Sequence, residues 1–258
     1  MWDAPLRPWD APQRRRGRFG SQKIKTRIDM KRYAYKIILA SSSPRRRELI
    51  EFLGIPVDFV VPEYTEEPPY ESENPASYAV RMSESKVLVS SEDQESGTII
   101  IGSDTVVSID NMILGKPRND VHAEYMLRLL RNEEHDIHTA LSVLWKDKHQ
   151  LTSTKVITGV RMRNYSDMDI SRYVASGDPM DKAGGYAIQN KEFHLVENLE
   201  GCYTSAIGLP LCYLTETLTK IGVQLPDMQR KCYMSLFNEC TDCFFLNAAS
   251  DYKRGESI

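Results

Sequence analysis

Short apolar runs alternate with amphipathic stretches along the central part of the chain. The apolar runs predict strands, and the amphipathic stretches, which begin at capping residues, predict helices. Strands are expected at 35–40, 57–61, 98–107, 136–146, 150–163 and 193–197. Helices are expected at 43–54, 74–91, 120–131, 166–177 and 209–221. Interleaved strands and helices predict an α/β fold, with one mixed, twisted sheet flanked by helices.

The two ends of the chain do not follow this pattern. Residues 1–32 hold ten basic and three acidic side chains, a charge of +7, which leaves −10 for the rest of a chain of net charge −3. We interpret residues 1–32 as a basic disordered leader, with binding to nucleic acid or anionic lipid as the alternative. Residues 223–258 are expected to form a poorly packed C-terminal tail, so the domain is 33–222.

Composition favours a soluble globular protein, with 41% hydrophobic and 27% charged residues. No apolar run reaches the roughly 18 residues of a transmembrane helix, and the N-terminus lacks the apolar stretch of a secretory signal. All five cysteines follow residue 200, which favours reduced thiols and a cytoplasmic location over a disulfide scaffold. Cys240 and Cys243 have C-x-x-C spacing, but they lack the full set of about four ligands that a zinc site needs.

A serine-rich turn with three following arginines joins the first strand to the first helix. Ser41 opens the turn, and Arg45, Arg46 and Arg47 lie in the first helical turn. Cations at a helix N-terminus oppose the helix dipole, so they need another partner, and guanidinium forks pair well with phosphate oxygens. The segment therefore predicts a phosphate site. The alternative is a solvated basic helix start.

Asp104 interrupts a run of Ile and Val in the strand 98–107. A carboxylate inside an apolar run is costly unless it is paired or used, so a metal ligand or general base is expected. The alternative is an Asp that hydrogen-bonds the local backbone. Glu66, Lys86 and Lys116 are weaker candidates when each is taken alone.

The segment 181–189 contains Gly184 and Gly185, followed by Tyr186 and Gln189. Adjacent glycines let a backbone approach a ligand closely, Tyr186 offers a stacking face, and the Gln189 amide could bind a base edge. The alternative is an ordinary loop that enters a strand. Together the four groups supply what nucleotide hydrolysis needs: cations for phosphates, carboxylates for a divalent ion and a polar group for the base.

Five motifs in order resemble the Maf family of nucleoside triphosphate pyrophosphatases. They are LASSSPRRREL at 39–49, IGSDTV at 101–106, GKP at 115–117, PMDKAGGYAIQ at 179–189 and IGLPL at 207–211. The resemblance covers about residues 35–222. It implies a Maf/ITPase-like domain with a central active-site cleft, which cleaves a nucleoside triphosphate into the monophosphate and pyrophosphate with Mg²⁺ or Mn²⁺.

The resemblance also implies a role for each matched position. Asp104 would activate the water and hold the metal, together with Glu66. The catalytic lysines would be Lys86 and Lys116, which neutralise charge. The substrate-binding residues would be Ser41, Arg45, Arg46, Thr105 and Gln189, and the last two together with Arg45 favour the dTTP/UTP subgroup.

Ser103 replaces the usual Ala, and Asn190 replaces the usual Gly after Gln189. Two alternatives stay open: a non-catalytic regulator of division or nucleic acid, and a pyrophosphatase for modified purine nucleotides or 7-methyl-GTP. The family further suggests a homodimer. We expect a nucleoside triphosphate as the partner, and neither nucleic acid nor membrane.

Overall fold

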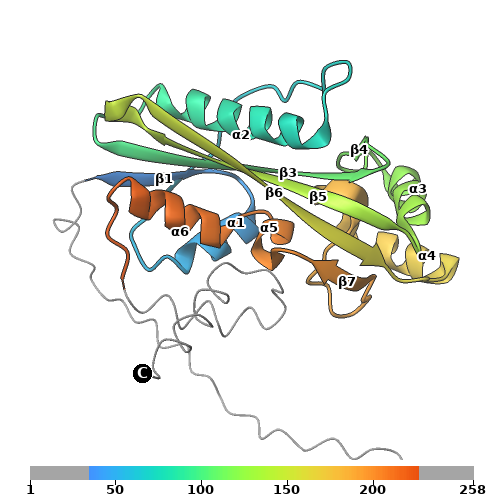
Figure 1. Ribbon diagram of the computed structural model, residues 1–258. Helices are drawn as coiled ribbons and strands as arrows, with labels where there is room; N and C mark the ends of the chain where they lie inside the picture. The colour runs from blue at the N-terminus through green and yellow to red at the C-terminus, as the bar shows by residue number, and fades with distance from the viewer. Residues whose placement is uncertain (1–34, 227–258) are drawn as a thin grey trace, which may run out of the picture.

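The computed structural model describes residues 35–226, which form one mixed sheet covered by helices (Figure 1). The strand order is β2-β1-β3-β5-β6-β7, and β4 pairs with β3. The first three strands pair in parallel, and all other pairs are antiparallel. The mixed α/β fold is therefore confirmed. The strands are β1 (Lys36–Ala40), β2 (Asp58–Val60), β3 (Thr98–Ile109), β4 (Met112–Leu114), β5 (Glu134–Trp145), β6 (Gln150–Met162) and β7 (Val196–Glu200).

Helices cover both faces of the sheet. In Figure 1, α2 lies along one face, whereas α1, α5 and α6 lie on the other, and α3 and α4 lie near one end of the long strands. The helices are α1 (Pro44–Glu51), α2 (Pro75–Ser91), α3 (Asp120–Leu130), α4 (Asp167–Ala175), α5 (Tyr203–Ile207) and α6 (Leu211–Lys220), with short 3₁₀ turns η2 (Lys146–Lys148), η3 (Asp178–Asp181) and η4 (Ala183–Gly185).

The central strand β3 is buried on both faces, which explains its continuous apolar sequence. Ile99 and Ile101 pack into the cluster that contains the apolar faces of α1 and α6. Ile100 points the other way and packs with Val87 of α2. At Gly102 an added Cβ would lie 2.5 Å from a methyl group of Val87, so α2 approaches this strand closely. Successive side chains of β3 thus pack alternately against the helices on the two faces of the sheet.

One edge of β3 is open in the middle. β1 pairs with β3 as far as Gly102, and β4 pairs with β3 only from Val107 onward. Within residues 35–226, no strand pairs with Ser103–Val106 on that edge, although β5 continues along the opposite edge. Side chains from both faces of β3 can therefore reach one space at the gap.

The strand predicted at 193–197 is wrong in position, because the structure places β7 at Val196–Glu200. The side-chain oxygen Oδ1 of Asn190 accepts hydrogen bonds from the backbone N–H groups of Glu192 and Phe193, at 3.1 and 3.2 Å. His194 then adopts a left-handed φ of 45°. This turn occupies the first part of the predicted strand.

Two short elements were not predicted, β4 and α5, because three- and five-residue segments carry little periodic signal. A turn at Asp110 and Asn111 follows β3, and both residues have positive φ. Its returning strand is β4. Helix α3 begins at Asp120. Its N-cap is Asn119, whose side chain accepts a hydrogen bond from the His122 N–H.

The described residues include no helix that is long and apolar enough to cross a membrane. The predicted leader 1–32 and the C-x-x-C pair lie outside the described residues. Val223 is buried against the cluster that α1 and α6 form, so close packing extends to this residue.

Candidate active site

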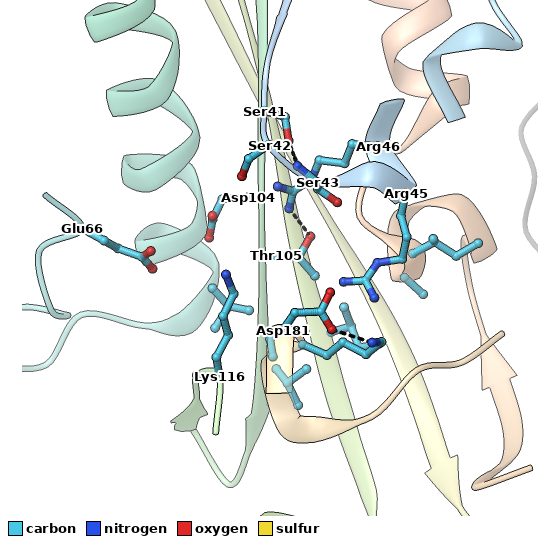
Figure 2. A pocket seen from close by; sticks show the side chains of 18 of the residues that line it. Ser41, Ser42, Ser43, Arg45, Arg46, Glu66, Asp104, Thr105, Lys116 and Asp181 are labelled. Carbon is cyan, nitrogen blue, oxygen red and sulfur yellow. Dashed lines mark hydrogen bonds and ion pairs between the residues drawn. The ribbon is translucent and has the colours of Figure 1, made fainter. Parts of the chain in front are cut away.

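A cleft of about 720 Å³ opens at the unpaired edge of β3 (Figure 2). Its walls come from the start of α1, the acidic segment after β2, the loop after β4, and the segment 181–189. The cleft brings together every predicted site residue: Ser41, Arg45, Arg46, Glu66, Lys86, Asp104, Thr105, Lys116 and Gln189. These residues span almost 150 positions of sequence, and the fold places them around one space.

Asp104 points from β3 toward α2, where it pairs with a lysine. The Lys86 ammonium donates a hydrogen bond to the Asp104 carboxylate and approaches the Ser103 carbonyl oxygen at 3.4 Å. The two side chains are only 12% and 10% exposed. Burial lowers the pKa of Lys86, and the charge of Asp104 opposes that shift. Asp104 is thus a paired carboxylate at the cleft, as its place in an apolar strand indicated.

Thr105 points to the opposite face of β3, toward α1. Arg46 donates to the Thr105 hydroxyl at 3.1 Å and, from Nε, to the Gly208 carbonyl at 2.8 Å. Burial lowers the pKa of Arg46, and nearby Asp104 raises it. Ser103 also donates to the Gly208 carbonyl, at 2.8 Å. The departure from Ala at position 103 therefore adds a hydrogen bond behind the cleft.

Gly208 has a structural role that the sequence analysis did not predict. Its φ is +122°, and an added Cβ would lie 3.3 Å from Nε of Arg46. A side chain here would be strained and would crowd the guanidinium. The glycine of the 207–211 motif thus leaves room for Arg46, and the motif itself was the available signal.

The three arginines of α1 have different partners. Arg47 donates through Nε and Nη2 to the Ser41 carbonyl, at 3.1 and 2.9 Å, and its guanidinium lies 5.1 Å from the centre of the Phe59 ring. It therefore supports the turn. Only Arg45 and Arg46 line the cleft. Ser43 is the N-cap residue of α1, but its hydroxyl makes no capping bond.

Glu66 lies on the opposite side of the cleft, in the irregular segment after β2 (Figure 2). The Tyr78 hydroxyl donates to the Glu67 carbonyl at 3.1 Å and approaches a Glu66 carboxylate oxygen at 3.4 Å. Burial, together with the charge of Glu66, raises the pKa of Tyr78 to about 12. Tyr64 and Tyr78 also line the cleft, and the sequence analysis did not select Tyr78 as a site residue.

The segment 181–189 differs from its prediction at the glycines and at Tyr186. Tyr186 is among the residues that line the cleft, but it is largely buried, and its hydroxyl lies 2.6 Å from Nε2 of His135. Gly184 and Gly185 have φ of 69° and 71°. An added Cβ would lie 3.0 Å from Val107 at Gly184 and 3.2 Å from Pro117 at Gly185, and neither glycine lines the cleft, so both glycines allow close packing of the chain.

Gln189 is exposed and lines the cleft. Asp181 is an additional carboxylate that was not predicted as a site residue. It pairs with the buried ammonium of Lys182 at 2.6 Å, and Figure 2 shows it among Thr105 and Arg45. Its pKa is lowered by Lys182 against an opposing effect of burial.

Comparison with known proteins identifies the family. A sequence model described as Maf-like protein matches residues 36–221, most of the chain. The chain belongs to the Maf family. Similar Maf proteins include two named dTTP/UTP pyrophosphatase: one from Dictyoglomus thermophilum is 41% identical over 74% of this chain and 98% of that protein. One from Geobacter sulfurreducens is 40% identical over 72% of this chain and 97% of that protein.

Solved structures at low identity also resemble this Maf chain. A HAM1 protein from Coxiella burnetii is 14% identical, with a TM-score of 0.42, and the match covers 72% of this chain and 99% of that one.

Proposed function

We propose that this Maf protein hydrolyses nucleoside triphosphates, with preference for dTTP and UTP, to the monophosphate and pyrophosphate. The observation that carries the proposal is the cleft at the open edge of β3. It combines a buried carboxylate, Asp104, with cationic side chains from three separate elements. Relatives about 40% identical over nearly their whole length are named dTTP/UTP pyrophosphatase, which supports the same activity here.

The cationic side chains of the cleft would bind the triphosphate. Arg45 and Arg46 come from α1, and Lys116 comes from the loop after β4. Guanidinium groups and ammonium groups stabilise phosphate oxygens, most strongly where charge develops on the leaving pyrophosphate. Ser41 adds a hydroxyl whose oxygen already accepts from the Ser43 N–H at 3.1 Å, which fixes its position.

Asp104 would accept the proton of the attacking water. General-base catalysis requires a carboxylate within hydrogen-bond reach of that water. The Lys86 ammonium orients the Asp104 carboxylate, because the two groups are paired and mostly buried. The water would attack the α-phosphorus, with Arg46 and Lys116 on the side of the departing pyrophosphate.

The donor set fits a small divalent cation. Among residues 35–226, no three His, Cys, Asp or Glu side chains form a metal-binding group. Mg²⁺ usually takes one or two carboxylates and completes its shell with phosphate and water oxygens. Asp104 and Glu66 line the same cleft and supply those carboxylates. A bound Mg²⁺ or Mn²⁺ would neutralise phosphate charge and lower the pKa of a nearby water.

The proposal also includes the residue that binds the base, the cellular location and the oligomeric state. Gln189 has the donor and acceptor that pair with the edge of uracil or thymine. We propose a cytoplasmic enzyme that forms a homodimer.

A substrate panel tests this function. Purified full-length protein with Mg²⁺ is given dTTP, UTP, CTP, 7-methyl-GTP and ITP, and pyrophosphate is measured as phosphate after added inorganic pyrophosphatase. We expect the highest kcat/KM for dTTP and UTP. Asp104→Asn should lower kcat by about 10²- to 10⁴-fold, the usual size of a general-base contribution. The exposed Asp93→Asn is the matched control. A preference for ITP or 7-methyl-GTP would overturn the specificity, and equal activity of Asp104→Asn would overturn the mechanism.

A further inference from the structure

The acidic segment 61–73, which forms one wall of the cleft, contains neither helix nor strand. Among the described residues, its only internal bond between backbone groups joins the Glu73 N–H to the Tyr70 carbonyl, at 3.0 Å. A segment with so few backbone bonds needs side chains to fix its conformation. Glu66 lies in the middle of it, so whatever fixes the segment also fixes Glu66.

Arg81 of α2 makes most of the contacts that hold the segment. Its Nε and Nη2 form a fork on the Glu73 carboxylate, at 2.9 and 2.7 Å. Nη1 lies 3.3 Å from the Glu67 carboxylate, and Nη2 donates to the Pro68 carbonyl at 3.0 Å. The guanidinium carbon also lies 3.9 Å from the centre of the Tyr70 ring. One side chain thus contacts the middle and the end of the segment.

The burial of these groups makes the contacts strong. The Arg81 side chain is 20% exposed and that of Glu73 is 11% exposed. The hydrogen bonds to Glu73 raise the pKa of Arg81, and those from Arg81 lower the pKa of Glu73, so both stay charged. A forked and partly buried pair of this kind is worth more than an exposed ion pair.

Tyr78 connects Arg81 to Glu66. It lies one helical turn before Arg81 on α2, and its ring centre is 5.2 Å from the Arg81 guanidinium carbon. Its hydroxyl contacts both the Glu67 carbonyl and the Glu66 carboxylate, as described above. Tyr78 and Glu66 line the cleft, whereas Arg81 is not among the lining residues.

We propose that Arg81 is a positioning residue that holds Glu66 in place for the divalent cation. The proposal rests on the proposed function of Glu66 as a cation ligand. Arg81 does not line the cleft and carries the wrong charge to bind a cation, so it acts through the Glu67 carboxylate, the Pro68 carbonyl and the Tyr78 ring. Partners that orient a metal ligand typically contribute about 10- to 100-fold in metal affinity.

The test measures Mn²⁺ binding by electron paramagnetic resonance, with the full-length chain and Mn²⁺ alone. Arg81→Ala should raise the Kd for Mn²⁺ about tenfold or more. Hydrogen exchange in residues 63–73 should become faster, while kcat at saturating Mn²⁺ stays close to that of the wild type. Arg128→Ala, which removes an exposed pair with Glu124 on α3, should leave the Kd unchanged.

A double variant separates positioning from a general loss of structure. Glu66→Gln should weaken Mn²⁺ binding by itself, and adding Arg81→Ala should weaken it no further. An unchanged Kd in Arg81→Ala, or an additive loss in the double variant, would refute the role of Arg81. If Arg81→Ala does not fold, Tyr78→Phe serves instead, since it removes the hydroxyl contacts and keeps the ring. Its Kd must then rise for the proposal to stand.

The outcomes also distinguish the two proposals. If the wild type releases no pyrophosphate from any triphosphate but Mn²⁺ binding depends on Arg81, only the proposed function fails. If the wild type is active and Arg81→Ala binds Mn²⁺ normally, only the positioning role fails.

Discussion

The two sides of the cleft are built by different means. The phosphate side, 41–46, connects β1 to α1, and its backbone is fixed by bonds such as Ser41 N–H to the Val60 carbonyl, at 2.9 Å. The acidic side, 61–73, depends on the side chains of Arg81 and Tyr78. The difference indicates a rigid site for the triphosphate, which faces a wall whose shape depends on two side chains of α2.

The phosphate side should be sensitive to the shape of a side chain even when its charge is kept. Arg46→Lys retains the cation but cannot bond both Gly208 and Thr105 while facing phosphate. We expect the KM for dTTP to rise about 10- to 100-fold, because a forked guanidinium is replaced by a single ammonium. Steady-state kinetics provides the measurement.

Arg128→Lys is the control for that experiment, since Arg128 lies on α3 in an exposed ion pair. An unchanged KM in Arg46→Lys would show that the triphosphate does not bind at the backbone-built side, and the comparison between the two sides would then fail.

A smaller effect should appear at acid pH in the segment 181–189, another wall held by side chains. Burial lowers the pKa of His135, which contacts Tyr186, to about 4. The unfolded chain therefore binds this proton more readily than the folded chain between about pH 6.5 and 4. Stability is fully present above about pH 6.5 and is lost as the pH falls toward 4. The loss from this group at pH 5.5 is about 1 kcal/mol.

Urea unfolding at pH 7 and pH 5.5 measures this loss. His135→Gln keeps a polar partner for Tyr186 without a titrating ring, so it should lose less stability on acidification than the wild type. The exposed His149→Asn is the control and should behave as the wild type does. Equal acid sensitivity in His135→Gln and the wild type would exclude His135 as the cause.

Local sequence predicted the parts of the molecule that depend on local forces. The strand and helix order, the turn after β1 and the interruption at Asp104 could all be predicted from periodicity and from the cost of a buried charge. The family resemblance then selected nine residues, and all nine line one cleft. The acidic wall could not be predicted this way, because Arg81 acts across a loop and carries no signal of its own.

Other features that the sequence analysis did not predict also depend on contacts that form only in the folded chain. The inward turn of Tyr186 depends on His135, which is 51 residues away in the sequence. The demand for glycine at 208 depends on Arg46, which is 162 residues away. The position of β7 depends on the side chain of Asn190, which closes the preceding turn. Contacts of this kind appear only when the chain is folded.

Isotope labelling tests the central claim most directly. The wild-type protein hydrolyses dTTP in H₂¹⁸O with Mg²⁺ under single-turnover conditions, and both products are analysed by mass spectrometry. Attack of water on the α-phosphorus in this cleft predicts one ¹⁸O atom in the monophosphate and none in pyrophosphate. Label in the pyrophosphate, or release of single phosphate groups in place of pyrophosphate, would contradict the account.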